Sequence, residues 1–279
     1  MTWNTYQRRY AETVKEKFEH KKSLGQHFLN SDYVPKKMCD AAEVAAGDLV
    51  VEIGPGTGVL TREILQRGAK VIAIEADERA ISALQENFAP EIDRDQLTIF
   101  HDDARTLDLN KYGLKTGQYK VVANIPYYIS GLLFRSFLDT PIHPNTLVFL
   151  VQKELAERIA RDPKESLLSL SVKVFGDPKY IGTIKRGHFT PPPQVDSAIV
   201  AVNNINFKGQ SKIEAKDFFK IIKLAFAQKR KQLAGNLAAE FERSEIEAAL
   251  SDLNLPLTIR GEDVSLADWI ALTEKLCSN

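Results

Sequence analysis

The sequence predicts an α/β protein of the Rossmann-like class, with a mostly parallel sheet, helices on both faces and a small all-helical domain towards the C-terminus. Between residues 47 and 202, short runs rich in Val and Ile alternate with helical stretches, the pattern of parallel strands joined by right-handed crossovers. A glycine-rich turn follows the first run, and polar residues follow the later ones. Ligand sites of such sheets lie at these strand ends.

Seven strands are expected, and the first five are continuous apolar runs that suit a sheet covered on both faces. The expected strands are 49–53, 70–74, 97–100, 120–123, 146–151, 181–184 and 198–202. Helices are expected between them, notably at 60–68, 79–88 and 154–160.

The polar segment NNINFKGQSK at 203–212 contains a Gly and is expected to link two domains. After it, apolar residues recur at helical spacing around 218–226, 245–253 and 265–276, and Ser265 with Asp268 resembles a capping box. Three parts are therefore expected: a charged N-terminal extension at 1–20, a main α/β domain at 21–207 and a helical domain at 208–279.

The composition is that of a globular protein, with 44% hydrophobic and 27% charged residues among 279. The first 22 residues lack the apolar core of a signal peptide, and the longest aliphatic runs are too short to cross a bilayer. Cys39 and Cys277 lie far apart, with no Cys or His at metal-ligand spacing. We therefore expect a cytoplasmic monomer with free thiols, no metal and no membrane segment.

The charge is unevenly distributed, although 37 basic and 37 acidic side chains give a formal net charge of zero. Residues 1–37 carry a net charge of +4, residues 208–235 carry +6, and residues 236–279 carry −6. Such segregation produces local basic surfaces that suit an RNA partner. A solvated helix face would give the same counts, so charge alone leaves both interpretations open.

The glycine-rich turn reads VEIGPGTG at 51–58. Gly54 and Gly56 allow the backbone to turn tightly and to approach a ligand. A dinucleotide-binding turn follows GxGxxG, but Val59 stands where the third Gly would be, and Pro55 removes one N–H donor. The turn is therefore poor for a diphosphate and suits a nucleoside joined to an amino acid. The absence of a phosphate loop with Lys also argues against an NTPase.

Carboxylates follow the second and third expected strands. Glu75 stands 21 residues beyond Gly54, where an acidic side chain can accept both hydroxyls of a ribose. Asp103 follows the third strand and can accept from an adenine amine. Together with the glycine-rich turn, these strand ends predict a site for S-adenosylmethionine.

The fourth strand runs into Asn-Ile-Pro-Tyr-Tyr at 124–128. The amine of a base such as adenine is a poor nucleophile because its lone pair is delocalised into the ring. The side-chain oxygen of Asn124 and the backbone carbonyl of Ile125 or Pro126, which Pro126 helps to position, can accept from that amine and free the lone pair. Tyr127 offers a face on which a base can stack. Because a sulfonium is an activated leaving group, methyl transfer here requires no strong general base.

These motifs, with SLGQHFL at 23–29 and FTPPPQVDS at 189–197, resemble those of the KsgA-type small-subunit (16S) ribosomal RNA adenine dimethyltransferases. The resemblance extends from Lys21 to the C-terminus. It implies dimethylation of the N6 amines of two adjacent adenines in a pre-assembled small subunit, with Phe189 against the second face of the target base. It further implies a cofactor site lined by His27, Leu29, Gly54, Glu75, Asp103 and Asn124.

The segment LAFAQKRKQL at 224–233 also matches the family, and the resemblance implies that Lys229, Arg230 and Lys231 lie where the helical domain meets ribosomal RNA. Consecutive helical residues cannot all face one way, so not all three need contact RNA.

Two alternatives remain. Macrolide-resistance methyltransferases share the cofactor site and the Asn-Ile-Pro-Tyr motif but modify large-subunit (23S) RNA, and the runs at 189–197 and 228–231 favour the small-subunit family over them. A non-catalytic RNA-binding or assembly factor with the same fold is the second alternative. Intact Asn124, Pro126 and Tyr127 argue against it.

Overall fold

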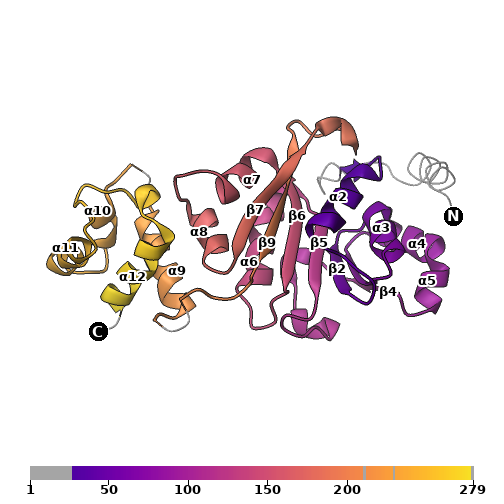
Figure 1. Ribbon diagram of the computed structural model, residues 1–279, viewed down its shortest axis with the longest axis horizontal. Helices are drawn as coiled ribbons and strands as arrows, with labels where there is room; N and C mark the ends of the chain where they lie inside the picture. The colour runs from indigo at the N-terminus through magenta and orange to yellow at the C-terminus, as the bar shows by residue number, and fades with distance from the viewer. Residues whose placement is uncertain (1–26, 210–211, 229, 278–279) are drawn as a thin grey trace. The chain divides into compact units, whose positions relative to one another are not determined.

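The computed structural model describes residues 27–209, 212–228 and 230–277, so the predicted extension at 1–20 lies outside the described residues (Figure 1). The strands in the described part are β1 (Phe28–Leu29), β2 (Leu49–Ile53), β3 (Lys70–Glu75), β4 (Leu97–His101), β5 (Lys120–Asn124), β6 (Thr146–Gln152), β7 (Asp177–Ile184), β8 (Phe189–Thr190) and β9 (Ser197–Asn203). All seven expected strands are present, and the sixth begins earlier than expected, at Asp177.

The main sheet has seven strands in the order β4-β3-β2-β5-β6-β9-β7. The pairings from β4 through β6 are parallel, and β9 lies antiparallel to β6. The order runs outward in opposite directions from the neighbours β2 and β5, which makes their junction a topological switch point. The predicted α/β class with a mostly parallel sheet is therefore confirmed.

The central strands are buried along most of their length, whichever way a side chain points. Four of the five residues of β2, five of the six of β3 and five of the seven of β6 are buried. Since successive side chains of a strand point to opposite faces, both faces of the sheet must be covered at these strands. The edge strand β4 is buried only at Leu97. Continuous apolar runs in the sequence thus correspond to the centre of the sheet.

Helices alternate with the strands as expected. The α-helices of the described residues are α2 (Tyr33–Ala41), α3 (Val59–Gln66), α4 (Glu78–Asn87), α5 (Ala89–Asp93), α6 (Ser130–Leu138), α7 (Lys153–Ala160), α8 (Leu167–Lys173), α9 (Ala215–Ala225), α10 (Leu233–Leu237), α11 (Arg243–Asp252) and α12 (Leu266–Cys277). Short 3₁₀ segments are η2 (Ala104–Thr106), η3 (Leu109–Tyr112), η4 (Tyr127–Ile129), η5 (Arg186–His188) and η6 (Gly261–Asp263).

The described residues form two compact units, each made of two chain segments. The first comprises residues up to 153 together with 179–203, and the second comprises 154–178 together with the residues from 204 onward. The second unit therefore includes a segment that lies inside the domain expected at 21–207. Its helix α9 buries Phe218, Phe219 and Ile222 and packs on α10 and α12.

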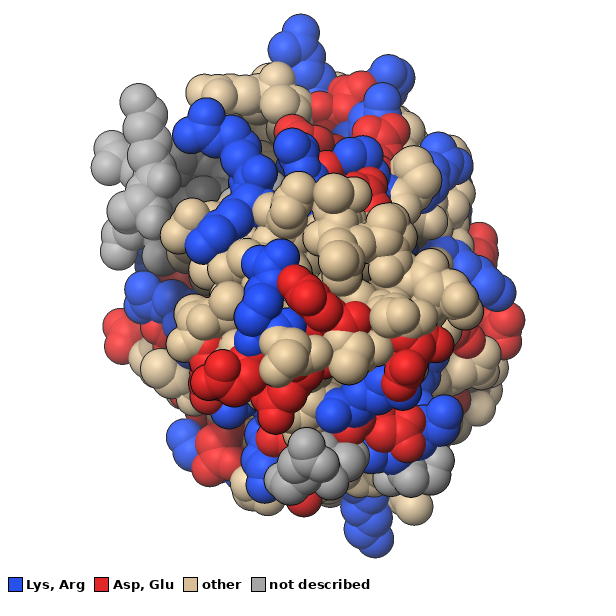
Figure 2. All heavy atoms as spheres, turned by 90° about the vertical axis from the view of Figure 1, so that its left-hand side faces the viewer, with Lys and Arg blue, Asp and Glu red and all other residues tan. Residues whose placement is uncertain are grey.

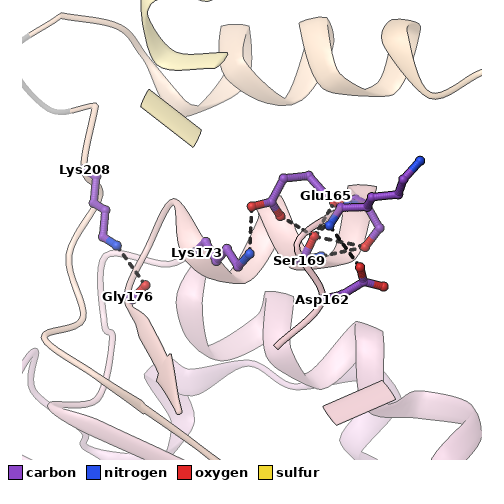
Figure 3. A network of polar contacts seen from close by, with 8 residues as sticks. Asp162, Glu165, Ser169, Lys173, Gly176 and Lys208 are labelled. Atoms are coloured by element: carbon purple, nitrogen blue, oxygen red, sulfur yellow. Dashed lines mark hydrogen bonds and ion pairs between the residues drawn. The ribbon is translucent and has the colours of Figure 1, made fainter. Parts of the chain in front are cut away.

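Polar contacts explain why residues 154–178 belong to the second unit (Figure 3). The ammonium group of Lys208 donates to the carbonyl of Gly176 at 3.0 Å, and the backbone N–H of Lys208 donates to the carbonyl of Val174 at 2.8 Å. The backbone N–H of Glu165 donates to the carbonyl of Glu262 at 2.8 Å. The segment expected as a linker at 203–212 is thus hydrogen-bonded to the end of α8.

A second, two-stranded sheet was not predicted from the sequence. It pairs β1 with β8 antiparallel, so that Phe28 lies opposite Thr190 and Leu29 opposite Phe189. This pairing joins Phe28 and Leu29, the end of the segment 23–29, to the first residues of the motif 189–197. The sequence analysis treated these two motifs separately.

Candidate active site

An open cavity of about 1140 Å³, its mouth included, lies at the carboxyl ends of β2, β3, β4 and β5. It is lined by residues 27–29, 52–57, 59–60, 74–77, 102–105 and 124–129. This is the edge of the sheet, beside the switch point between β2 and β5, where ligands of open α/β sheets bind. The cavity brings together the predicted residues His27, Leu29, Gly54, Gly56, Glu75, Asp103, Asn124, Pro126 and Tyr127.

The glycine-rich turn forms one wall of the cavity, and at two of its glycines a side chain is excluded for steric reasons. Gly56 has a φ of +56°, and a Cβ there would lie 2.9 Å from a ring carbon of Phe28. Gly58 has a φ of +83°, and a Cβ there would lie 2.4 Å from the ring of Phe88. The turn therefore needs glycine both for its conformation and for the approach of the ring of Phe28.

Glu75 at the end of β3 connects to this turn. Its Oε2 accepts from the backbone N–H of Gly56 at 3.1 Å, while Oε1 accepts from the N–H groups of Ala76 and Asp77 at 2.9 and 3.0 Å. Burial raises the pKa of this carboxyl, and the three N–H groups offset part of that effect. The carboxylate is held in one place and retains lone pairs for ligand hydroxyls.

Glu52 is a second buried carboxyl in the cavity wall, and the sequence analysis did not select it. Its Oε2 accepts from the hydroxyl of Thr61 at 2.6 Å, and the side chain is almost fully buried. Burial is the main cause that raises the pKa of Glu52 to about 8; the hydrogen bond from Thr61 opposes this rise and the nearby Glu75 adds to it. The signal in the sequence is an acidic residue inside the apolar run Leu49–Ile53.

Asp103 follows β4 and is held by a neighbour. The side chain of Arg105 donates to both carboxylate oxygens, with its Nη2 at 2.6 Å from Oδ2 and its Nε at 3.0 Å from Oδ1. These bonds and the backbone N–H of Arg105 lower the pKa of Asp103. A ligand that bonds to Asp103 therefore shares the carboxylate with Arg105, which also lines the cavity.

Asn124 is the last residue of β5, and its amide has a defined orientation. Its Nδ2 donates to the backbone carbonyl of His27 at 3.0 Å. A carbonyl oxygen only accepts hydrogen bonds, so the NH₂ end of the amide must face His27 and the Oδ1 is turned away from it. The predicted acceptor is therefore positioned by the segment that precedes β1.

The backbone after Asn124 distinguishes between two carbonyls. The N–H of Ile129 donates to the carbonyl of Pro126 at 3.2 Å, which closes the 3₁₀ turn η4. The carbonyl of Ile125 has no such bond from the described residues. Of the two carbonyls that the sequence analysis considered as acceptors, that of Ile125 is the one left for a ligand.

Tyr127 is held from two sides. Its hydroxyl bonds to the hydroxyl of Ser197 at 2.7 Å, and its ring stacks on His27 with centroids 5.9 Å apart and planes inclined by 30°. The ring of His27 is fixed in turn by Nδ1, which donates to the carbonyl of Pro191 at 2.9 Å. Ser197 ends the motif 189–197, so the late motif positions the tyrosine of the Asn-Ile-Pro-Tyr motif. Sequence reasoning missed this role because a lone Ser gives no spacing signal.

Phe189 does not line the cavity. Its side chain is 3% exposed and belongs to the main hydrophobic cluster, together with Leu29 and Val34. The pairing of β1 with β8 places it opposite Leu29, which does line the cavity. Its predicted stacking against a target base stays a prediction.

Comparison with known proteins identifies the family. The family model described as "Ribosomal RNA adenine dimethylase" matches residues 17–276. The chain belongs to the ribosomal RNA adenine dimethylase family. Among its curated relatives are proteins named "Ribosomal RNA small subunit methyltransferase A". The one from Dehalococcoides mccartyi is 37% identical over 92% of this chain and 87% of its own length, and that from Bacillus licheniformis is 32% identical over 93% and 92%.

Solved structures agree with this assignment to the adenine dimethylase family. A dimethyladenosine transferase from Plasmodium falciparum matches with a TM-score of 0.75 and 26% identity, covering 88% of this chain and 96% of that one. The 23S rRNA methyltransferase ErmE matches with a TM-score of 0.70 and 24% identity, covering 89% and 99% of the two chains. The second likeness is evidence for a common fold.

The family resemblance implied three basic residues as RNA contacts. Lys229 lies outside the described residues, while Arg230 and Lys231 lie in the second unit and are exposed. The N–H of Leu233 donates to the carbonyl of Ile259 at 2.9 Å, which brings the chain around Lys231 next to the exposed Arg260. Arg230, Lys231 and Arg260 form no ion pair with any described residue. Arg260 was missed because it is remote in sequence from the basic run.

Other charges of this unit are largely paired. Figure 2 shows the side on which Figure 1 labels α10 and α11, where basic and acidic side chains are interspersed around an uncharged area. Lys220 pairs with Glu240 at 2.5 Å, and Lys275 pairs with Asp252 at 2.7 Å. The segregated charge of the sequence is therefore partly neutralised in the fold, because Glu240 and Glu274 of the acidic segment 236–279 meet Lys220 and Lys212 of the basic segment 208–235.

Among the described residues of this chain, no group of three His, Cys, Asp or Glu side chains is placed to hold a metal ion. No helix in the same described part combines the length and the apolar character that crossing a bilayer requires.

Proposed function

We propose that this chain transfers methyl groups from S-adenosylmethionine to the N6 amines of two adjacent adenines in small-subunit (16S) ribosomal RNA during ribosome biogenesis. The observation that carries the proposed chemistry is the orientation of Asn124, whose Nδ2 is bonded to His27 and whose Oδ1 is left to accept. The family and the names of the curated relatives support the substrate class.

The cavity suits a nucleoside joined to an amino acid. The turn around Gly56 has no room for a Cβ on the side of Phe28, and the strand ends offer carboxylate acceptors at Glu75 and Asp103. The guanidinium of Arg105, which also lines the cavity, is already paired with Asp103. We assign the binding of S-adenosylmethionine to His27, Leu29, Gly54, Gly56, Glu75, Asp103 and Asn124. When bound, this cofactor supplies a methyl group on a positively charged sulfur.

The side chains at the end of β5 act on the adenine. The Oδ1 of Asn124 and the carbonyl of Ile125 accept from the N6 amine, which favours a pyramidal nitrogen with a freer lone pair. Tyr127 provides a face for the base, and its orientation is fixed by Ser197 and His27. Phe189 is proposed for the opposite face of the base. The proton leaves after transfer, so no strong base is assigned.

The second unit is the proposed RNA-contacting part. The proposed substrate of the whole chain is a small subunit that is already assembled. Lys229, Arg230 and Lys231, with Arg260, supply cations for the phosphate backbone. We propose that the chain works as a monomer, since all assigned groups come from one chain.

Transfer of labelled methyl groups tests the proposal. The purified chain is incubated with labelled S-adenosylmethionine and with small or large ribosomal subunits that lack adenine dimethylation, and the nucleosides are then separated. Label in N6,N6-dimethyladenosine from the small subunit alone is the expected result. Label from the large subunit would assign the chain to the 23S-modifying group. Tight binding without label would instead indicate an assembly factor.

A further inference from the structure

An exposed aromatic pair lies in the first unit, outside the cavity. Tyr33 is 50% exposed, and its ring stacks on the imidazole of His188 with centroids 5.4 Å apart and planes inclined by 25°. His188 is fixed by the hydroxyl of Ser31, 3.3 Å from its Nδ1. A half-exposed tyrosine held in one orientation is a platform on which another flat ring can stack.

Two cations without a carboxylate partner accompany this pair. The ammonium group of Lys37 lies 5.6 Å from the ring centroid of Tyr33 and 3.4 Å from its hydroxyl. Arg186 is exposed and precedes His188 by two residues. Neither forms an ion pair with a described residue, whereas the adjacent lysines do, Lys36 with Asp32 and Lys185 with Asp196. The acidic side chains of this surface are therefore already paired, and Lys37 and Arg186 remain for an anion.

The surface is connected to the cavity through the β1–β8 sheet. At one end of that sheet, His27 in the cavity wall bonds to Pro191. At the other end, Asn30 donates through its backbone to His188 at 3.0 Å and through its side chain to Gly187 at 2.9 Å. Asn30 lies three residue steps after His27, which is about 10 Å along an extended chain. A strand of RNA with its target base in the cavity reaches this surface within a short distance.

We propose that Tyr33, His188, Lys37 and Arg186 form a second RNA contact, which takes an unpaired nucleotide near the target adenine. Its base stacks on the Tyr33–His188 pair and its phosphate is bound by Lys37 and Arg186, the combination that single-stranded nucleic acids require. This inference rests on the proposed function. It adds a contact in the catalytic unit to the cations of the second unit.

Binding to undimethylated small ribosomal subunits tests it, using the full chain. Tyr33→Ala should weaken binding about tenfold, and Tyr33→Phe, which keeps the ring, should bind like the parent. Lys37→Glu combined with Arg186→Glu should also weaken binding about tenfold. It should make the slope of log affinity against log salt shallower by roughly 1 to 2, because two phosphate contacts are lost.

The matched control combines Lys70→Glu with Lys115→Glu, which makes the same charge change on exposed lysines of the same unit. Lys70 is the first residue of β3, at the end of that strand that lies away from the cavity. Cofactor affinity and thermal stability show whether each variant is folded. If Tyr33→Ala is unstable, the double variant Lys37→Glu, Arg186→Glu still tests the inference. Parental affinity and salt slope in the Lys37–Arg186 variant would overturn the inference. So would a photo-reactive phenylalanine analogue replacing Tyr33 that crosslinks to ribosomal protein instead of RNA. Failure of the parent to methylate would refute the proposed function separately.

Discussion

The side-chain NH₂ of Asn124 donates a hydrogen bond to the backbone carbonyl of His27 at 3.0 Å, although the two residues are 97 positions apart. One amide therefore has two tasks. Its nitrogen attaches the segment before β1 to the end of β5, and its oxygen is left as the proposed acceptor for the target amine. Changes at this position should affect both tasks, to different extents.

Asn124→Asp should lower the rate of methyl transfer at least a hundredfold, in the range found for single catalytic hydrogen-bonding groups. The carboxylate keeps the shape of the amide but cannot donate, so it repels the carbonyl of His27. Asn124→Ala should also abolish transfer. Cofactor affinity should fall only several-fold in both. Single-turnover transfer and equilibrium binding measure the two effects, with the exposed Asn206→Asp as control, and a parental rate in Asn124→Asp would contradict the assignment.

Ser197→Ala should raise the KM for the small subunit, because it leaves the partly buried hydroxyl of Tyr127 without its partner at a cost of about 1 kcal/mol. Tyr127→Phe removes the other hydroxyl of the pair and keeps the ring. The double variant should lose much less than the two single variants together, since no unpaired hydroxyl remains. Additive losses in this double-mutant cycle would show that the two hydroxyls do not act as a pair.

Arg105→Leu should tighten the binding of S-adenosylmethionine by roughly two- to fivefold. The guanidinium occupies both oxygens of Asp103, the predicted acceptor for the cofactor adenine, and the exposed pair itself contributes little to stability. Calorimetric titration measures the change, and the gain should shrink in high salt. Arg94→Leu, which removes an exposed pair with Glu91, is the control. Weaker binding in Arg105→Leu would mean that Arg105 supports the ligand instead of competing with it.

Glu52 should make the stability of the first unit depend on pH. Burial raises its pKa to about 8, so the folded protein retains a proton that the unfolded chain releases near pH 4.5. The free energy of unfolding that this bound proton contributes is fully present below pH 4.5 and is lost as the pH rises to 8. Glu52→Gln should remove this dependence and stabilise the protein above pH 8 by a few kcal/mol, on the order that such a pKa difference implies. Urea unfolding at pH 5 and 9 measures it, and parallel pH profiles for the two proteins would contradict it.

Arg230→Glu combined with Arg260→Glu should weaken binding to small subunits more than tenfold while cofactor affinity stays unchanged. The two cations have no ion pair with described residues, and reversing both adds repulsion from phosphates. Arg243→Glu, on α11 of the same unit, reverses a charge that is paired with Glu247 and should change binding less than twofold. Normal methylation by the double variant would show that the RNA surface is wrongly assigned.

The sequence predicted the sheet well because its central strands are buried on both faces and therefore read as unbroken apolar runs. The cavity residues followed from the same reasoning, since each predicted carboxylate or amide stands just after such a run. Ser197, Glu52 and the role of His27 were not predictable in this way. Their partners are Tyr127, Thr61 and Asn124, and only the packing of separate segments brings these pairs together.

The domain boundary illustrates the same limit. The segment 203–212 was expected to be a polar linker, but its Lys208 bonds to Gly176 and Asp177, so the start of the second unit is defined by contacts with residues about thirty positions earlier. The polar composition shows where the chain leaves the main sheet. It does not show that the earlier helix α8 belongs to the second unit.

The pairing of β1 with β8 also bears on the order in which the nascent chain can complete its catalytic unit. Phe28 and Leu29 leave the ribosome some 160 residues before their partners Phe189 and Thr190. At typical rates of synthesis this is a delay of roughly 10 to 30 seconds. During it, the amide of Asn124 and the turn at Gly56 have already been made, while the strand that holds His27 against them has no partner. The proposed cofactor site is therefore finished late, when most of the chain has been translated.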